Sequence, residues 1–167
     1  VAALLVLAEK YHLRLAEKSI GIVGVGNVGK RVAAKCQALG MRTVLNDPPL
    51  ARQTGDACYC PLPEVQDCDF VTLHTPLTFT GPDKTHHLAG SSFFEGLNPG
   101  AVLLNSSRGQ VHSTDALKAS LQSGKLKAAV LDVWEKEPVI DTELLGMVDL
   151  ATPHIAGYSV QGKHNGT

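Results

Sequence analysis

The sequence predicts an α/β fold built on a doubly wound parallel sheet, and three observations support this prediction. Short apolar runs alternate with helical or capped segments, at the spacing of strand–helix–strand units. These runs are continuously apolar, which is typical of strands covered by helices on both faces. The first run leads into a Gly-x-Gly-x-x-Gly loop at residues 24–29 and then into a helical pattern. Together they indicate a Rossmann-type nucleotide-binding domain.

The N-terminal segment predicts a helix followed by a buried strand. Residues 1–17 are expected to be helical, because apolar residues recur there at helical spacing. These residues are Leu4, Leu7, Tyr11 and Leu15. The run SIGIVGV at 19–25 is short, apolar and ends in glycines, so we expect it to form the first strand of the sheet.

A second helix and strand follow the glycine loop. The helix is expected to place one apolar face inward and to end at Gly40. That face consists of Val28, Val32, Cys36 and Leu39. The strand at 42–47 closes at Pro48-Pro49, and the turn-rich residues 50–63 are expected to form a loop.

The second half of the chain continues the alternation of strands and helices. Residues 76–90 predict an irregular loop, and Ser91 or Ser92 caps a brief helix, with Ser92 and Glu95 fitting a capping box. A longer helix is capped at Ser113 or Thr114 and ended by Gly124. The remaining strands are expected at residues 69–76, 101–107, 127–134 and 148–155.

Composition excludes several classes of function. A chain of 167 residues is about one domain long, and its formal net charge of −1 gives no attraction to nucleic acid or an anionic membrane. No apolar run reaches the roughly 18–20 residues that span a bilayer. The cysteines lack the spacing of a zinc site, so we expect no metal and reduced thiols in the cytoplasm. They are Cys36, Cys58, Cys60 and Cys68.

The glycine loop predicts binding of a dinucleotide. Gly24 permits a tight turn, Gly26 lets the backbone approach a pyrophosphate, and Gly29 allows close packing of the helix. Free N–H groups at the start of the helix then face the phosphate oxygens. The alternative is an ordinary strand–helix turn, but the position of the motif directly after a strand favours the cofactor site.

Asp47 predicts that this dinucleotide is NAD. It ends the second strand, 18 residues beyond Gly29, where a carboxylate accepts hydrogen bonds from the ribose hydroxyls of NAD and repels the 2′-phosphate of NADP. The alternative is an Asp that merely begins a Pro-Pro turn. Arg42 and Arg52 lie nearby in sequence, so NADP stays open as the cofactor.

Three polar residues of complementary type follow predicted strands in the second half. They are Arg108, Glu137 and His154. The carboxyl ends of parallel strands form the binding crevice of such a sheet, so we expect these side chains to share one site. Each alone is also compatible with an ordinary surface residue. As a set, they indicate a catalytic group of a base, a carboxylate and a cation.

At these positions the sequence resembles the D-isomer-specific 2-hydroxyacid dehydrogenases. The matching segments are GIVGVGNVGK, HTPL, LNPGAVLLNSSRG, LDVWEKEP and TPHIAGY. The Arg-to-Glu interval of 29 residues and the Glu-to-His interval of 17 also match the family's catalytic triplet. Ser107 and Lys136 depart from the common family residues, and neither change removes a catalytic group.

The resemblance implies an NAD-dependent oxidoreductase that transfers a hydride from a 2-hydroxy acid. His154 acts in it as general base, Glu137 orients the imidazole, and Arg108 binds the substrate carboxylate with Tyr158. The implied cofactor contacts run from the glycine loop to the nicotinamide end. They come from Gly24, Gly26, Asn27, Val28, Gly29, Asp47, Thr75, Ser106, Ser107, Arg108, Asp132 and Gly157.

The tail from His154 to Thr167 is most similar to one branch of the family, whose substrate is a phosphorylated hydroxy acid. A sister specificity, of the phosphoglycerate or glyoxylate/hydroxypyruvate type, and a non-catalytic NAD-sensing module stay open as alternatives. The resemblance also implies a larger homodimeric protein. We expect a connecting helix at 1–18 and an NAD-binding domain at 19–153. Residues 154–167 are expected to begin the return to a substrate domain that lies outside this chain. Without that domain, the chain is expected to be inactive.

Overall fold

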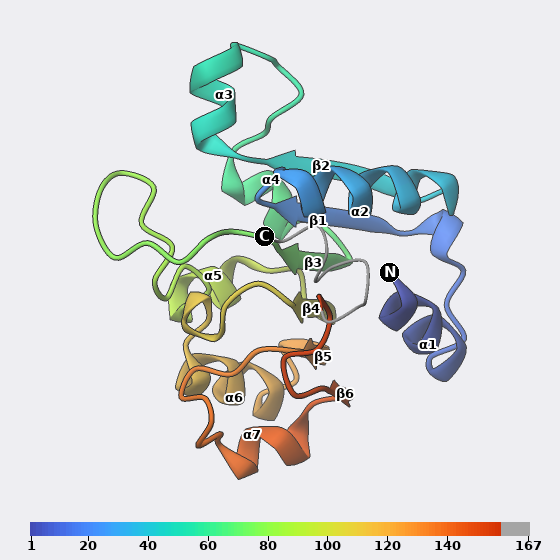
Figure 1. Cartoon of the computed structure of the whole chain (residues 1–167). Helices are drawn as coiled ribbons and strands as arrows, with labels where there is room; N and C mark the ends of the chain where they lie inside the picture. The colour runs from blue at the N-terminus through green and yellow to red at the C-terminus, as the bar shows by residue number, and fades with distance from the viewer. Residues whose placement is uncertain (158–167) are drawn as a thin grey trace.

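The computed structural model describes residues 1–157 and contains one parallel sheet. In the described part of the chain, six strands lie in the order β2-β1-β3-β4-β5-β6, and every neighbouring pair is parallel. The order reverses direction at β1, as in a doubly wound sheet, so the predicted fold class is confirmed (Figure 1). The strands are β1 Ser19–Val23, β2 Arg42–Asn46, β3 Phe70–Leu73, β4 Ala101–Asn105, β5 Leu126–Leu131 and β6 Leu150–Ala151.

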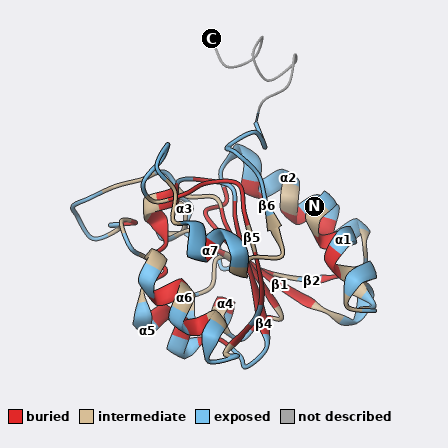
Figure 2. Cartoon of the chain, turned by 90° about the horizontal axis from the view of Figure 1, so that it is seen from below, coloured by how far each residue is buried: buried red, intermediate tan, exposed pale blue. Residues whose placement is uncertain are grey.

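Helices connect the strands and cover both faces of the sheet (Figure 2). On one face, α1 and α2 pack over β1 and the adjoining strands, with Leu4, Leu7 and Cys36 fully buried. On the other face, α4, α5 and α6 enclose a second apolar core around Phe94, Leu103 and Leu117. The helices are α1 Ala2–Lys10, α2 Asn27–Ala38, α3 Pro48–Thr54, α4 Leu62–Gln66, α5 Ser91–Gly96, α6 Thr114–Gln122 and α7 Thr142–Met147, with 3₁₀ turns η1 Leu15–Glu17 and η2 Gly109–Val111.

The segment after β2 differs from its prediction as a loop, because it contains two short helices. Asp47 caps α3 by accepting a hydrogen bond from the backbone N–H of Leu50 at 3.0 Å. The prolines that suggested a turn occupy the first positions of α3, where no intrahelical N–H is needed. Gly55, with φ of +67°, ends that helix.

Three details of the predicted helices are also wrong. The N-terminal helix ends at Lys10 instead of residue 17, because His12 takes a left-handed conformation. On α2, Cys36 is buried and Val32 and Leu39 pack against the core as predicted, but Val28 is 58% exposed and Gly29 and Ala33 complete the buried face. Helix α5 begins after Gly90 with no side-chain cap, so the expected capping box does not form. Ser113 does cap α6 as predicted, accepting from the N–H of Ala116.

One buried histidine, His112, and one half-buried histidine, His74, predict a stability that falls in acid. Burial lowers the pKa of both His74 and His112 from 6.5 to about 4. Between these values the unfolded chain binds protons that the folded chain does not, so stability falls as the pH drops from 6.5 towards 4. We expect a loss of about 2 kcal/mol for each histidine between pH 7 and pH 5 in urea unfolding followed by Trp134 fluorescence.

The matched variants for this prediction are His112→Asn and His12→Asn. The first removes a fully buried titrating group and is expected to flatten the pH dependence, although it lowers stability at pH 7. The second changes an exposed histidine, whose positive φ of 52° an asparagine tolerates, and is expected to leave the pH dependence unchanged. An equal pH dependence in both variants would contradict the assignment.

Candidate functional site

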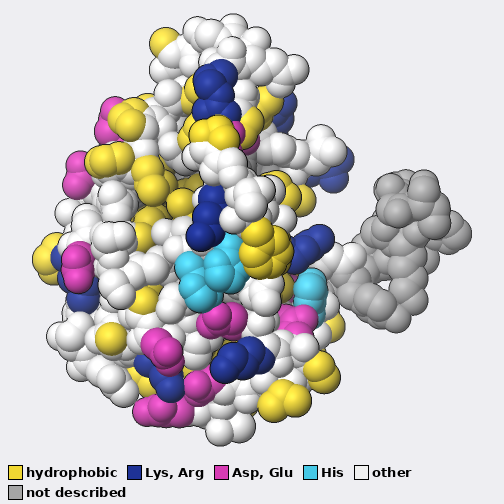
Figure 3. Space-filling model, turned by 90° about the vertical axis from the view of Figure 1, so that its left-hand side faces the viewer, with side chains coloured by type: hydrophobic (Ala, Val, Ile, Leu, Met, Phe, Trp, Pro, Cys, Tyr) yellow, Lys and Arg dark blue, Asp and Glu magenta, His cyan; other side chains and the backbone are white. Residues whose placement is uncertain are grey.

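The carboxyl ends of the strands meet at one edge of the sheet, and the candidate site lies along this edge. The glycine loop follows β1, Asp47 follows β2, Thr75 lies just beyond β3, and Arg108 lies beyond β4. The loops after β5 and β6 carry Glu137 and His154, respectively. Figure 3 shows one face of the molecule, on which histidine side chains lie close together with basic and acidic side chains around them.

The three glycines of the loop differ in what a side chain at each position would meet. Gly24 has φ of +87°, and a Cβ there would lie 2.7 Å from the carbonyl of His74. A Cβ on Gly29 would lie 2.1 Å from the carbonyl oxygen of Gly24, so the loop and the start of α2 require a hydrogen at this position. A Cβ on Gly26 would meet nothing within 4 Å. The loop therefore leaves open space at Gly26, in front of the first N–H groups of α2.

Asp47 ties the glycine loop to α3. One carboxylate oxygen accepts from the N–H of Val25 at 2.8 Å, and the other accepts from Leu50 at 3.0 Å. Both oxygens have a remaining lone pair, which the hydroxyls of a ribose can use. The turn interpretation and the cofactor interpretation of Asp47 are therefore compatible, because one carboxylate caps the helix and faces the cavity next to it.

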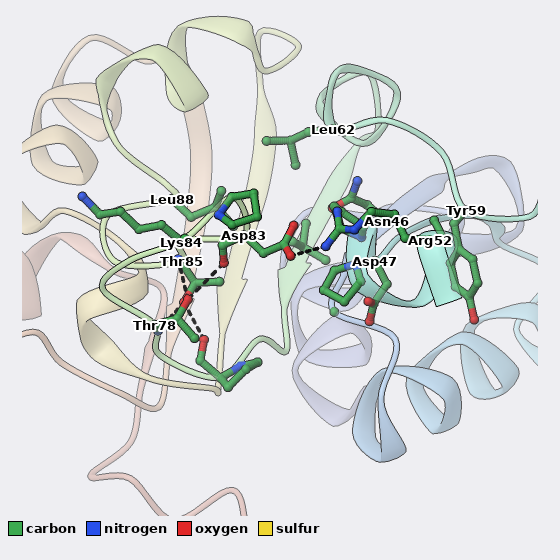
Figure 4. A pocket seen from close by; sticks show the side chains of 18 of the residues that line it. Asn46, Asp47, Arg52, Tyr59, Leu62, Thr78, Asp83, Lys84, Thr85 and Leu88 are labelled. Atoms are coloured by element: carbon green, nitrogen blue, oxygen red, sulfur yellow. Dashed lines mark hydrogen bonds and ion pairs between the residues drawn. The ribbon is translucent and has the colours of Figure 1, made fainter. Parts of the chain in front are cut away.

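A cavity of about 800 Å³ opens beside Asp47, between α3 and the loop 76–90 (Figure 4). Its walls are mostly apolar, with prolines, Tyr59 and Leu88 among them. An ion pair between Arg52 of α3 and Asp83 of the loop crosses this cavity. The carboxylate of Asp83 raises the pKa of the Arg52 guanidinium above its ordinary value.

A second cavity, of about 560 Å³, lies on the other side of the glycine loop. Three predicted cofactor residues line it: Val28, Ser106 and Asp132. The exposure of Val28, which is unexpected for a core residue of α2, is explained by this position. Gly24 lines the first cavity and Val28 the second, so the loop separates two cavities at one edge of the sheet.

Glu137 and His154 form a hydrogen-bonded pair. The Nδ1 atom of His154 lies 2.8 Å from Oε2 of Glu137. An ionised carboxylate only accepts, so Nδ1 carries the hydrogen and Nε2 keeps a lone pair that accepts a proton. The His154 side chain is about half exposed, which leaves it accessible to a substrate. The pair borders a cavity of about 370 Å³ with an apolar floor.

Trp134 and Asp132 hold this pair in place. The backbone N–H of Trp134 donates to Oε1 of Glu137 at 2.8 Å, and its indole N–H donates to the carbonyl of Thr152 at 3.1 Å. The Asp132 carboxylate accepts from Thr152 and from the N–H groups of Ile155 and Ala156, all within 3 Å. Sequence analysis missed this anchoring of the His154 segment, because it depends on contacts between two strand-end loops.

Arg108 lies on a loop that packs against the Glu137 loop. The Arg108 side chain is exposed, and Nη1 donates to the carbonyl of Ser107 at 2.7 Å. A Cβ on the next residue, Gly109, would lie 1.9 Å from the carbonyl oxygen of Trp134. The structure therefore brings the backbone of the Arg108 loop into direct contact with the loop that positions Glu137.

The side chain of Asn105 supports the Arg108 loop from below. Its Nδ2 donates to the carbonyl of Arg108 at 3.0 Å and to the buried His112 at 2.9 Å. Its Oδ1 accepts from both the N–H and the hydroxyl of Ser107. Ser107 is thus buried against Asn105, whereas Ser106 is exposed and lines the second cavity.

The residues along this edge fit an NAD molecule. The open space at Gly26 suits a pyrophosphate at the start of α2, and cavities lie on both sides of it. The hydroxyl of Thr75 is buried beside the glycine loop and has no hydrogen-bond partner within residues 1–157. Gly157 lies at the end of the described chain and is exposed. Tyr158, the predicted substrate contact, lies outside the described residues.

These features define a dinucleotide-binding α/β domain with a His–Glu pair at the carboxyl edge of its sheet. The family model "D-isomer specific 2-hydroxyacid dehydrogenase, NAD binding domain" matches residues 7–156. The chain belongs to this family, as its NAD-binding domain. Within residues 1–157, no helix has the length and apolarity needed to cross a membrane.

Curated relatives are similar over almost the whole chain. The chain is 48% identical over 167 residues to the erythronate-4-phosphate dehydrogenase of Edwardsiella ictaluri and, at the same identity, to that of Escherichia coli O1:K1. Both alignments cover 99% of this chain but only 44% of the relative. The chain therefore spans less than half the length of these relatives.

Solved structures of the same family share the fold. A glyoxylate reductase from Paecilomyes thermophila has a TM-score of 0.78 at 26% identity, covering 96% of this chain and 52% of that one. A D-lactate dehydrogenase from Aquifex aeolicus, crystallised with NAD and lactic acid, has a TM-score of 0.76 at 29% identity, covering 90% and 50%. The cofactor of the domain is thus NAD, as the glycine loop and Asp47 predicted.

Proposed function

We propose that the protein to which this chain belongs oxidises a D-2-hydroxy acid with NAD. The observation that supports this most directly is the Glu137–His154 pair, held at 2.8 Å beside the carboxyl edge of a sheet that binds NAD. When bound, NAD would supply the acceptor for the hydride that leaves C2 of the substrate. The chain supplies the groups that bind the acid and move the proton of its hydroxyl.

In this mechanism His154 is the general base. Its Nε2 accepts the proton of the C2 hydroxyl while the hydride leaves C2, and Glu137 stabilises the imidazolium that forms. The Glu137 carboxylate also fixes the tautomer, because Nδ1 already donates to it. Arg108 binds the substrate carboxylate with its two-pronged guanidinium, and Tyr158 adds a further substrate contact.

The cofactor is expected to extend across the glycine loop. Asp47, with Thr75 nearby, would hold the adenosine end beside its cavity, and Gly26 with the first N–H groups of α2 would hold the pyrophosphate. Ser106 and Asp132, which line the second cavity, would hold the nicotinamide end. The remaining backbone contacts come from Gly24, Asn27, Val28, Gly29, Ser107 and Gly157.

The substrate we propose is 4-phospho-D-erythronate, oxidised to its 2-oxo acid in the biosynthesis of pyridoxal 5′-phosphate (vitamin B6). The names of relatives that are 48% identical across 99% of the chain support this assignment. We expect a cytoplasmic homodimer, in which a substrate domain outside this chain binds the phosphate. Residues 1–18 connect to that domain, residues 19–153 bind NAD, and residues 154–167 begin the return.

Assay of the full-length protein tests this proposal. We expect NADH formation with 4-phospho-D-erythronate at a kcat/KM at least about a hundredfold above that with 3-phosphoglycerate or glycolate, because a site built for a charged group rejects substrates that lack or misplace it. A higher kcat/KM with another hydroxy acid would assign a sister specificity. NAD binding without turnover of any hydroxy acid would indicate an NAD-sensing module.

A further inference from the structure

The cavity beside Asp47 contains a charged pair that the proposed mechanism does not use. Arg52 of α3 and Asp83 of the loop 76–90 form an ion pair across the cavity (Figure 4). The second cation that lines this cavity is Lys84, and Figure 4 shows its side chain directed away from Arg52. Arg52 is the cation carried into the cavity wall by the helix that Asp47 caps, and it already has an anionic partner.

The position of Asp83 is fixed by its own loop. The hydroxyl of Thr78 donates to the carbonyl of Asp83 at 3.0 Å, and the N–H of Thr85 donates back to Thr78 at 3.0 Å. The hydroxyl of Thr85, which is buried, donates to the carbonyl of Pro76 at 2.6 Å. This network closes the loop on itself, so Asp83 is presented to Arg52 by a braced backbone.

The position of Arg52 is fixed by the helix that Asp47 caps. Asp47 accepts from the N–H of Leu50 in the first turn of α3, and Arg52 lies in the last turn of the same seven-residue helix. Both side chains line one cavity, on the side opposite the Asp83 loop. The carboxylate that is expected to bind the ribose and the Arg52 guanidinium are therefore carried by one short helix and its N-cap.

From this arrangement we infer that Asp83 is a specificity-determining residue that favours NAD over NADP by holding Arg52. The inference rests on the proposed placement of the adenosine end beside Asp47. NADP differs from NAD by a 2′-phosphate on that ribose, and arginine binds phosphate through two parallel N–H groups. With Arg52 paired to Asp83, a 2′-phosphate meets two carboxylates and no free guanidinium.

Substitution of Asp83 in the full-length protein tests the inference by binding. We expect Asp83→Asn to raise the affinity for NADP about fivefold or more in calorimetric titration at low ionic strength, because Arg52 is released. The affinity for NAD is expected to stay within about twofold, since its 2′-hydroxyl carries no charge. Asp83→Glu keeps the charge and is expected to retain the discrimination.

The double variant Arg52→Ala/Asp83→Asn identifies the group responsible. It is expected to bind NADP as weakly as the unsubstituted protein, because Arg52→Ala removes the guanidinium that Asp83→Asn alone would free. Glu143→Gln, which removes an exposed partner of Lys118 away from the cavity, is the matched control and should change neither affinity. An unchanged NADP affinity in Asp83→Asn, a gain that persists in the double variant, or equal losses of NAD and NADP binding would overturn the inference alone. Failure of the unsubstituted protein to bind NAD would overturn the cofactor site and this inference together.

Discussion

Replacing His154 with alanine in the full-length protein is expected to lower kcat about a thousandfold with little change in NAD affinity. A positioned general base contributes roughly 10²–10⁴-fold to rate, and Nε2 of His154 is the free basic atom of the pair. His154 lines neither of the cavities beside the glycine loop, so the Kd of NAD should stay within about twofold. Steady-state turnover at pH 8 and calorimetric titration of NAD measure the two effects.

Two further variants separate the base from its surroundings. Glu137→Gln keeps the hydrogen-bonding shape but loses the charge that stabilises the imidazolium, and we expect a smaller loss, about a hundredfold, with a shifted pH profile of kcat. The matched control is His87→Ala. His87 also pairs with a carboxylate, Glu135 at 2.6 Å, but has no role in the proposed mechanism, so turnover should change less than a few-fold. Turnover of His154→Ala within a few-fold of the unsubstituted protein would reject the base assignment.

The sheet was predictable because its determinants are local in sequence. Continuous apolar strands between capped helices require burial on both faces, and the six expected strands all appear. Their ends were placed too late, as at β6, where only Leu150 and Ala151 remain paired. The residues that follow the observed strand ends belong to loops. Their backbone N–H groups donate to side chains such as the carboxylate of Asp132 and not to a neighbouring strand.

The site was only partly predictable, because its geometry depends on contacts between distant segments. The positions of Glu137 and His154 at neighbouring strand ends indicated that they meet, and they lie 2.8 Å apart. No periodicity indicates that Trp134 donates to Glu137 or that Gly109 must lack a side chain against Trp134. The dual contact of Asp47, with Val25 and with α3, was missed for the same reason, since Pro48 and Pro49 resemble a turn as much as a helix start.

Alanine substitutions at two glycines of the same motif are expected to change the stability of the protein to different extents. In Gly29→Ala the new methyl meets the backbone oxygen of Gly24 at 2.1 Å, so the loop or α2 must shift, and we expect a loss of about 1–3 kcal/mol in the free energy of unfolding. In Gly26→Ala the methyl meets no atom within 4 Å, and the backbone, at φ of −71° and ψ of −156°, is extended and not left-handed. Stability should therefore change by less than about 0.5 kcal/mol.

The alanine substitution at Gly26 is expected to change the affinity for NAD, although it leaves the stability unchanged. The space in front of Gly26 is where a pyrophosphate would approach the start of α2, so Gly26→Ala is expected to weaken NAD binding about tenfold or more while the protein stays folded. Gly146→Ala is the matched control, because its methyl also meets nothing within 4 Å but lies in α7, away from both cavities. It should keep full NAD affinity. If Gly26→Ala bound NAD as well as Gly146→Ala does, the open space at the glycine loop would not be the phosphate site, and the path proposed for the cofactor across the loop would be wrong.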